Sequence, residues 1–361
     1  MEPRAIAATK KGRGARSNAS GRFEPTTRVV VDDGWERSDD DELPPLRTTV
    51  TVDSTRTIIA RNDSPDIPFD RSINPYRGCE HGCIYCFARP SHAYLGLSPG
   101  LDFESRLFAK PDAARLLERE LRAPSYRCEV MALGTNTDPY QPIERRLTVT
   151  RQILEVLSAF SHPVGIVTKS ALVARDIDIL APMAKRKLAR VFLSITTLDP
   201  VLARRMEPRA ATPARRLETI KALADAGIPV GVMAAPMIPA LNDRELESIL
   251  EAAAGAGASA AGYILLRLPL EIKDLFAEWL EGHYPDRAKH VLNLVRGARG
   301  GALYDPKFGE RMRGKGAYAD LLANRFAVAT KRLGLDRRED DALDTSQFKP
   351  PPMAGDQLSL L

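Results

Sequence analysis

Short apolar segments alternate with amphipathic helical segments through the middle of the chain, and this alternation constrains the fold most strongly. Residues 164–168 form a β-branched run typical of a strand, whereas residues 148–160 carry apolar side chains at helical spacing. Such alternation indicates a parallel sheet covered on both faces. We expect a short strand before Cys79, further strands at 128–133, 164–168, 190–195, 228–233 and 263–266, and helices at 148–160, 176–187, 213–226, 243–254, 272–281 and 287–296.

Counted as strand–helix pairs, these segments make six β/α units. Six units are too few for the closed eight-stranded barrel. In parallel α/β sheets, ligands bind at the carboxyl ends of the strands. We therefore look for functional residues where each strand ends.

Three of the four cysteines lie within eight residues, at the spacing Cys79-x3-Cys83-x2-Cys86. Gly78 and Gly82 stand beside the first two, and glycine allows the backbone to bend tightly around a bulky object. Disulfides are disfavoured, because the clustered thiols are odd in number and the chain begins without an apolar signal region. A loop of this kind is expected to direct its thiols toward one centre.

Two metal centres remain open for this loop. Zinc normally takes four protein ligands, and His81, His92 or Cys128 could supply the fourth. An iron–sulfur cluster prefers thiolate ligands, and three cysteines on a four-iron cluster leave one iron without a protein ligand. An open iron is a place for chemistry.

The cysteine spacing, with Tyr85 directly before Cys86, resembles the signature of the radical S-adenosylmethionine (SAM) superfamily. The resemblance implies a partial (β/α)6 barrel and a [4Fe–4S] cluster held by Cys79, Cys83 and Cys86. It also implies SAM bound at the open iron, reductive cleavage of SAM, and hydrogen abstraction from a substrate. An electron donor such as flavodoxin or ferredoxin is implied as well.

Within that superfamily, the strand ends resemble the subgroup that contains spore photoproduct lyase. Gly134, Thr135, Thr137 and Asp138 follow the second strand, in the position of a loop that binds the SAM amino group. Lys169 resembles the lysine that pairs with the SAM carboxylate, a sound match of charges. Ser194 resembles a hydroxyl that contacts the ribose. The resemblance also places Glu207 and Arg209 among the SAM-binding residues.

Two positions depart from that lyase. It has a tyrosine directly after the third cysteine and a hydrogen-donating cysteine at the end of strand two, whereas this chain has Phe87 and Thr135 there. Neither side chain can relay a hydrogen atom, which argues against a lyase that uses this relay. Tyr85 remains, and we expect it to pack against the cluster.

The net charge of +5 does not by itself indicate a nucleic-acid partner, because residues 1–22 account for all of it. Residues 185–221 contain ten Lys or Arg and three acidic residues. This excess of positive charge favours either a solvated helical surface or a site that binds an anionic substrate. No apolar run reaches the length of a membrane span. We expect a cytoplasmic protein without a membrane partner, where an oxygen-sensitive cluster is protected.

The final residues Gln357–Leu361, Gln-Leu-Ser-Leu-Leu, resemble the short peptide by which bacterial repair and replication proteins bind the DNA sliding clamp. Together with the lyase-like features, this favours a nucleic-acid substrate and a role in DNA repair. The competing hypothesis is a non-enzymatic scaffold that binds zinc in the cysteine loop and docks on the clamp.

Two further segments carry expectations. We expect residues 94–106 to form a substrate-facing lid near the cluster, and Cys128 to be a buried thiol at the start of a strand.

The composition of the chain also divides it into parts. The expected parts are a disordered tail at 1–45, a β-hairpin and loop at 46–70, a radical SAM core at 71–270, a helical extension at 271–335 and a disordered tail at 336–361.

Overall fold

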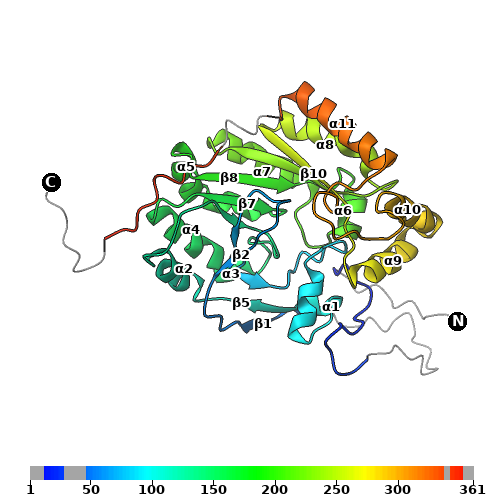
Figure 1. The fold of residues 1–361 in the computed structure, drawn as a ribbon, viewed down its shortest axis with the longest axis horizontal. Coiled ribbons are helices and arrows are strands. Elements are labelled where there is room, and N and C mark those ends of the chain that lie inside the picture. Colours follow the sequence, from blue (N-terminus) through cyan, green and yellow to red (C-terminus); the bar gives the residue numbers. More distant parts are fainter. Residues whose placement is uncertain (1–11, 28–45, 337–341, 353–361) are drawn as a thin grey trace.

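The computed structural model describes residues 12–27, 46–336 and 342–352, and its centre is a seven-stranded sheet (Figure 1). The strand order is β10-β9-β8-β7-β6-β3-β2; all pairs from β3 to β10 are parallel, and β2 joins the edge antiparallel. The predicted partial (β/α)6 barrel is confirmed. The strands are β2 (Ile59–Arg61), β3 (Arg71–Ile73), β6 (Met131–Leu133), β7 (Val164–Thr168), β8 (Ala189–Ser194), β9 (Val230–Met237) and β10 (Ala260–Leu265).

A row of branched apolar side chains crosses the sheet and forms the centre of the core. The register pairs Ile73 with Leu133, Leu133 with Ile166, Ile166 with Val191, and Val191 with Val230. All five side chains are buried. Strands buried on both faces explain why these segments are nearly continuous apolar runs.

Helices connect the strands, and α8 and α11 lie side by side next to β10 (Figure 1). Local sequence sets their ends: the Thr212 side chain accepts from Arg215 N–H to cap α7, and Pro213 occupies its first turn. No described helix is long and apolar enough to cross a membrane. The helices are α2 (Ala113–Leu121), α3 (Glu144–Leu147), α4 (Val149–Ala159), α5 (Ile177–Lys185), α6 (Pro200–Met206), α7 (Pro213–Asp225), α8 (Leu246–Gly255), α9 (Ile272–His283), α10 (Pro285–Gly297) and α11 (Ala317–Leu333), with the 3₁₀ helices η2 (Ala171–Asp176) and η3 (Asp243–Glu245).

A segment after α10 links the two ends of the open sheet. Leu265 N–H, in the last strand, donates to Met312 O at 2.9 Å. One residue earlier, Arg311 pairs with Asp66, which lies in the loop between β2 and β3. The partial barrel is therefore braced across its open side.

The prediction of a β-hairpin within residues 46–70 is wrong. Its two strands form, but β1 (Thr49–Val52) pairs with β5 (Arg106–Ala109) in parallel, β5 pairs with β4 (Tyr76–Arg77), and β2 pairs with β3. The Glu120 carboxylate accepts from Ile58 and Ile59 N–H and so holds the connecting segment against α2. Partners distant in sequence therefore replace the local turn.

The tail expected to be disordered at 1–45 is also partly wrong, because residues 12–27 pack against the core. We call this segment the N-terminal strap. Gly14 and Ala15 N–H donate to the Glu104 carboxylate at 2.9 and 2.8 Å, and Arg13 Nη1 donates to Glu104 O at 2.6 Å. Glu104 is fully buried, and a buried carboxylate needs such donors. The strap supplies them.

The C-terminal tail expected at 336–361 is ordered over residues 342–352. The Phe348 ring contacts Tyr126, Phe160 and His162, and Lys349 N–H donates to Phe160 O at 3.0 Å. These partners precede β6 and β7, so this segment lies at the amino ends of the strands. Residues 357–361 lie outside the described residues.

We expect His162 to make stability depend on pH. Its ring is buried, Nδ1 donates to Pro163 O at 3.0 Å and Nε2 accepts from Tyr126 OH at 2.7 Å, so the neutral form fits the site. Burial lowers the pKa of His162 to about 4, against about 6.5 when unfolded. Between these values only the unfolded chain takes up the proton, so stability is full above pH 6.5 and falls by on the order of 3 kcal/mol as pH drops to 4.

Urea denaturation of the wild type and His162→Gln across this pH range measures the effect. The variant should lose this part of the pH slope, whereas His290→Gln, at an exposed site on α10, should keep it. Equal slopes for all three proteins would contradict the assignment.

We expect Gly14→Ala to release the strap. A Cβ on Gly14 would overlap the Gly82 carbonyl oxygen of the cysteine loop, and neither backbone can yield without moving the loop. Overpacking of this kind costs about 2 kcal/mol. The apo protein should therefore unfold at lower urea, and its loop cysteines should react faster with a thiol reagent. The control is Gly255→Ala in α8, where a Cβ meets open space: this protein should unfold at the same or higher urea, because alanine favours the helix, and its cysteines should react as in the wild type. A Gly14→Ala protein that behaves like this control would refute the packing role.

Candidate active site

The cysteine loop begins directly after β4 and is mostly buried. Cys79 and Cys83 are buried, Cys86 is half-buried, and all are free thiols. Gly78 and Gly82 adopt left-handed φ angles of 74° and 68°. A Cβ on Gly78 would lie 2.8 Å from Phe103 O, so only glycine fits there.

The three thiols share one electrostatic environment. Burial raises the pKa of Cys79 and of Cys83 well above the ordinary value, and nearby Asp138 and Glu207 add to this; burial also raises the pKa of Cys86. Backbone N–H groups soften the penalty, from Asp138 to Cys79 and from residues 88 and 89 to Cys86. Buried thiols that receive N–H donors fit a centre that takes thiolates as ligands.

The loop does not gather a set of ligands for one metal ion. Among the described residues, no three His, Cys, Asp or Glu side chains converge on such a point. His92 Nε2 lies 2.9 Å from Arg106 O, and His81 Nδ1 lies 3.4 Å from Asp138. Cys128 is only half-buried, three residues before β6 begins, which corrects its expected place as a buried residue of that strand.

Asp138 connects the cysteine loop to two strand ends. Its carboxylate accepts from Thr168 Oγ1 at 2.6 Å and from Lys169 N–H at 2.8 Å, and it faces His81. Burial alone would raise the pKa of Asp138, but His81 and these donors outweigh it and lower the pKa to about 2. Asp138 is therefore an ionised brace between the loop, β6 and β7.

The neighbouring predicted residues fall into two groups. Thr137 is buried and its hydroxyl donates to Tyr76 O at 3.1 Å, so it supports the chain just before the cysteines. Thr135 is half-exposed and donates to Asn74 at 3.2 Å. Gly134 has φ 91°, and a Cβ there would overlap Val167 O.

Lys169 directs its ammonium toward the cysteine loop. Its Nζ lies 5.7 Å from the centre of the Tyr85 ring, and its charge lowers the pKa of both Cys83 and Cys86. No carboxylate in the described part of the chain forms an ion pair with it. The site thus contains a half-buried cation available to an anionic ligand.

Glu207 is the centre of a buried network beneath the loop. It accepts from Tyr85 OH, from Arg216 Nη2 and, at 2.6 Å, from Thr196 Oγ1. Burial raises the pKa of Glu207, and Arg216 opposes this. Arg216 also donates to Ser194 O at 2.8 Å, so its guanidinium fixes the end of β8. Tyr85 therefore makes a hydrogen bond that the sequence did not predict, and its packing against a cluster stays a prediction.

Arg209 braces the loop from outside. Its Nη2 donates to Glu80 at 3.1 Å and its N–H donates to His81 O at 3.3 Å. The other cations of residues 185–221 are divided between the two ends of β8: Lys185 precedes the strand and Arg204 follows it. The basic residues of this run therefore do not form a single site for an anionic substrate.

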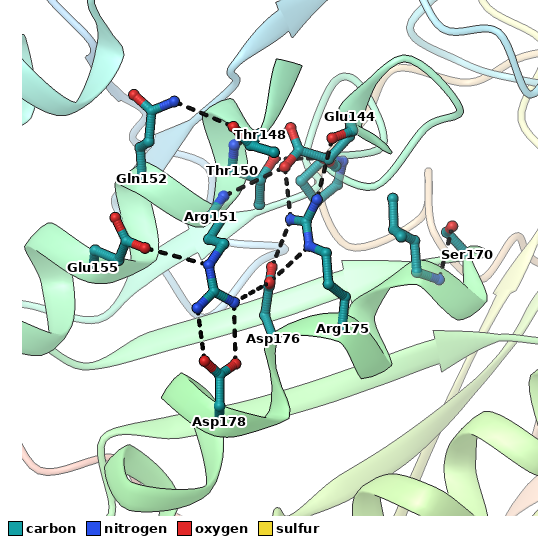
Figure 2. A network of polar contacts seen from close by, with 12 residues as sticks. Glu144, Thr148, Thr150, Arg151, Gln152, Glu155, Ser170, Arg175, Asp176 and Asp178 are labelled. Atoms are coloured by element: carbon teal, nitrogen blue, oxygen red, sulfur yellow. Dashed lines mark hydrogen bonds and ion pairs between the residues drawn. The ribbon is translucent and has the colours of Figure 1, made fainter. Parts of the chain in front are cut away.

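A second buried carboxylate, Glu144, fixes the entry to the loop (Figure 2). It accepts from Tyr76 OH, from Thr150 N–H at 3.0 Å and from Arg175 Nη2 at 2.8 Å. Arg175 also pairs with Asp176, as Figure 2 shows. Burial and Glu144 raise the pKa of Tyr76, which keeps its proton for this bond.

Two important residues were missed by sequence reasoning, Glu104 and Arg89. Both are fully buried and paired, and Arg89 Nε also donates to Cys83 O at 2.8 Å. The segment at 94–106 holds Glu104 in α1 (Leu101–Ser105), after the turn η1 (Arg89–Leu95). It lies against the loop as expected, since Phe103 O accepts from Cys79 N–H; its role as a lid stays a prediction.

Comparison with known proteins gives the family. Residues 73–253 match the radical SAM superfamily. The chain is 39% identical over 249 residues to an uncharacterized protein of Mycobacterium tuberculosis (strain ATCC 25618 / H37Rv), covering 68% of this chain and 72% of that protein. It is 27% identical over 223 residues to an uncharacterized protein of Methanocaldococcus jannaschii, covering 61% of this chain and 79% of that protein.

Among solved structures, spore photoproduct lyase complexed with dinucleoside spore photoproduct has a TM-score of 0.57 and 18% identity, covering 79% of this chain and 78% of that chain. A mutant of the same lyase in which phenylalanine replaces a tyrosine also has a TM-score of 0.57, with 17% identity over 84% of this chain and 86% of that chain. The chain therefore belongs to the radical SAM superfamily of enzymes, a family that works with a [4Fe–4S] cluster and SAM.

Proposed function

We propose that Cys79, Cys83 and Cys86 hold a [4Fe–4S] cluster and that the enzyme cleaves SAM reductively to abstract hydrogen from a nucleic-acid substrate. The observation that supports this most is that one loop carries three free thiols, two of them buried, close enough for their charges to act on one another. The Lys169 ammonium, which has no carboxylate partner among the described residues, lies beside this loop at the end of β7. When bound, the cluster supplies the electron for SAM cleavage and so generates the radical that takes the hydrogen atom.

The residues around the loop divide between contact and support. We assign Lys169 to the SAM carboxylate, because its charge has no partner within the described residues. The half-exposed segment Gly134–Thr135 is assigned to the SAM amino group. The side chains of Asp138, Glu207 and Arg209 are engaged by protein partners, which supports a positioning role for them: Asp138 with Lys169 N–H, Glu207 with Tyr85, and Arg209 with Glu80. Ser194 stays assigned to the SAM ribose, because Arg216 binds only its backbone carbonyl oxygen.

A nucleic-acid substrate is supported by two features. Spore photoproduct lyase, which shares the fold, was solved with a dinucleoside photoproduct. The C-terminal sequence resembles a sliding-clamp peptide. The hydrogen relay expected of that lyase is not available here, since Phe87 and Thr135 occupy its positions. We therefore propose a DNA-repair reaction of a different course.

Anaerobic reconstitution with iron and sulfide tests the cluster. The wild type should turn brown, bind about four irons per chain and form 5′-deoxyadenosine when dithionite is added. Cys83→Ala should lose iron and SAM cleavage together, because only two thiolates remain. The matched control is Cys128→Ala, outside the loop, which should retain both. A colourless wild type that holds zinc, or a Cys83→Ala protein that still cleaves SAM, would exclude the proposal.

The same assay then identifies the substrate class. Damaged and intact DNA and RNA are added separately, and a nucleic-acid substrate should increase 5′-deoxyadenosine formation by the wild type. If no nucleic acid changes the amount of 5′-deoxyadenosine formed by a protein that still cleaves SAM, the proposal of a nucleic-acid substrate is wrong. The proposal of radical SAM activity would still stand.

We also propose that Gln357–Leu361 binds the sliding clamp. Phe348 anchors the preceding segment at the amino ends of the strands, opposite the cysteine loop, so clamp binding would leave the site open. Deleting residues 357–361 should abolish binding of purified clamp in a titration, while the Cys128→Ala protein binds normally. Unchanged clamp binding by the shortened protein would refute this.

A further inference from the structure

Phe87 is an exposed aromatic side chain at the rim of the cysteine loop. It directly follows Cys86, and 45% of its surface is exposed, although residues 88–90 are buried. Leaving a large apolar ring in water contributes nothing to folding stability. A ring in this place is instead available to a ligand at the carboxyl ends of the strands.

Arg267 covers part of this ring. Its guanidinium carbon lies 5.0 Å from the centre of Phe87. Arg267 lies two residues after β10, the last strand of the sheet. Its contact with Phe87 therefore places the end of β10 beside the cysteine loop, which follows β4. The pair therefore joins the two ends of the barrel beside the cysteines.

Among the described residues, no carboxylate lies within ion-pair distance of the Arg267 guanidinium, although the charge of Asp66 acts on it. Its Nη1 donates to Met312 Sδ at 3.1 Å, its Nε is buried without an acceptor, and no carboxylate in this part of the chain forms an ion pair with it. Burial lowers the pKa of Arg267, and a hydrogen bond with the neutral Tyr304 side chain opposes this. A sulfur atom is a weak acceptor, so an anionic oxygen from a ligand would satisfy this cation far better.

A second arginine–phenylalanine pair lies next to the first, although its arginine, Arg311, also forms an ion pair with Asp66. Phe308 is 52% exposed, and the Arg311 guanidinium carbon lies 4.6 Å from the centre of its ring. Arg311 and Arg267 are close enough for each charge to act on the other. Alternation of exposed aromatic rings and cations is the arrangement by which proteins bind single-stranded nucleic acid.

We propose that Phe87 and Arg267 form a binding subsite for a single nucleic-acid strand. A base stacks on the open part of the Phe87 ring, a phosphate oxygen accepts from the Arg267 guanidinium, and the exposed Phe308 ring continues the track. This deepens the proposed function and rests on it. An acidic peptide would use the guanidinium but leave the two exposed rings in water, so the nucleic acid is the better match.

Fluorescence anisotropy tests the subsite, with the reconstituted enzyme and a short labelled oligothymidine. Arg267→Gln and Phe87→Ala should each raise Kd about five-fold or more. Arg267→Gln should also reduce the slope of log Kd against log salt by about 0.7, because one phosphate contact is lost. Phe87→Tyr, which keeps the ring, should bind like the wild type.

The matched charge control is Arg332→Gln on α11, where the arginine is exposed and paired with Glu251. It should leave the affinity unchanged. Arg267→Gln lies outside the cysteine loop, so it tests the subsite even where Phe87→Ala disturbs iron loading.

Two outcomes would overturn the subsite. One is equal oligothymidine affinity for Arg267→Gln and the wild type. The other is tighter binding of a labelled polyglutamate peptide that depends on Arg267, which would assign the site to a peptide. Failure of the proposed function shows separately, as a wild type that neither holds iron nor cleaves SAM.

Discussion

Three carboxylates hold the cysteine loop, two of them buried and one nearly so, and the site depends on them. Glu104 binds the strap and Arg89, Asp138 binds His81 and the end of β7, and Glu207 binds Tyr85 and Arg216. A buried charge that loses its partners costs several kcal/mol. Moving the loop would break all three sets of contacts at once. Rigidity in a segment with little regular structure therefore comes from charge pairing rather than from backbone ladders.

This arrangement separates support from reaction. The supporting groups face the protein and are satisfied by it. Lys169 and Arg267, in contrast, have no carboxylate partner within the described residues, and the Phe87 ring stays partly exposed. The parallel sheet places all three at one edge, since every strand from β3 to β10 runs the same way. Preorganised cations next to the cysteines suit ligands that are anionic, as SAM carboxylate and phosphodiesters are.

This chain shares its fold with spore photoproduct lyase but differs from it in side chains that would take part in the reaction. The two chains share the partial barrel at 18% identity. Phe87 replaces a hydroxyl-bearing ring at the position that we matched to the lyase, and its own contact is with Arg267. A position that cannot relay a hydrogen atom can still bind a substrate by stacking. The same scaffold can therefore place a different side chain beside the cysteine loop.

The sequence alone determined the six parallel strands, because β-branched runs such as 164–168 indicate burial on both faces. It also identified the three cysteines as candidate ligands, because their spacing within one short segment is visible in the sequence. It did not determine which strands pair outside the barrel: β1 joins β5, not β2, since Glu120 and β5 compete with the local turn. Nor did it reveal Glu104, Arg89 or the strap, in which Ser17 donates to Glu278, 261 residues further along the chain. Spacing within one segment carries local geometry, whereas the pairing of a buried charge depends on which distant segment folding brings beside it, and only the tertiary structure decides that.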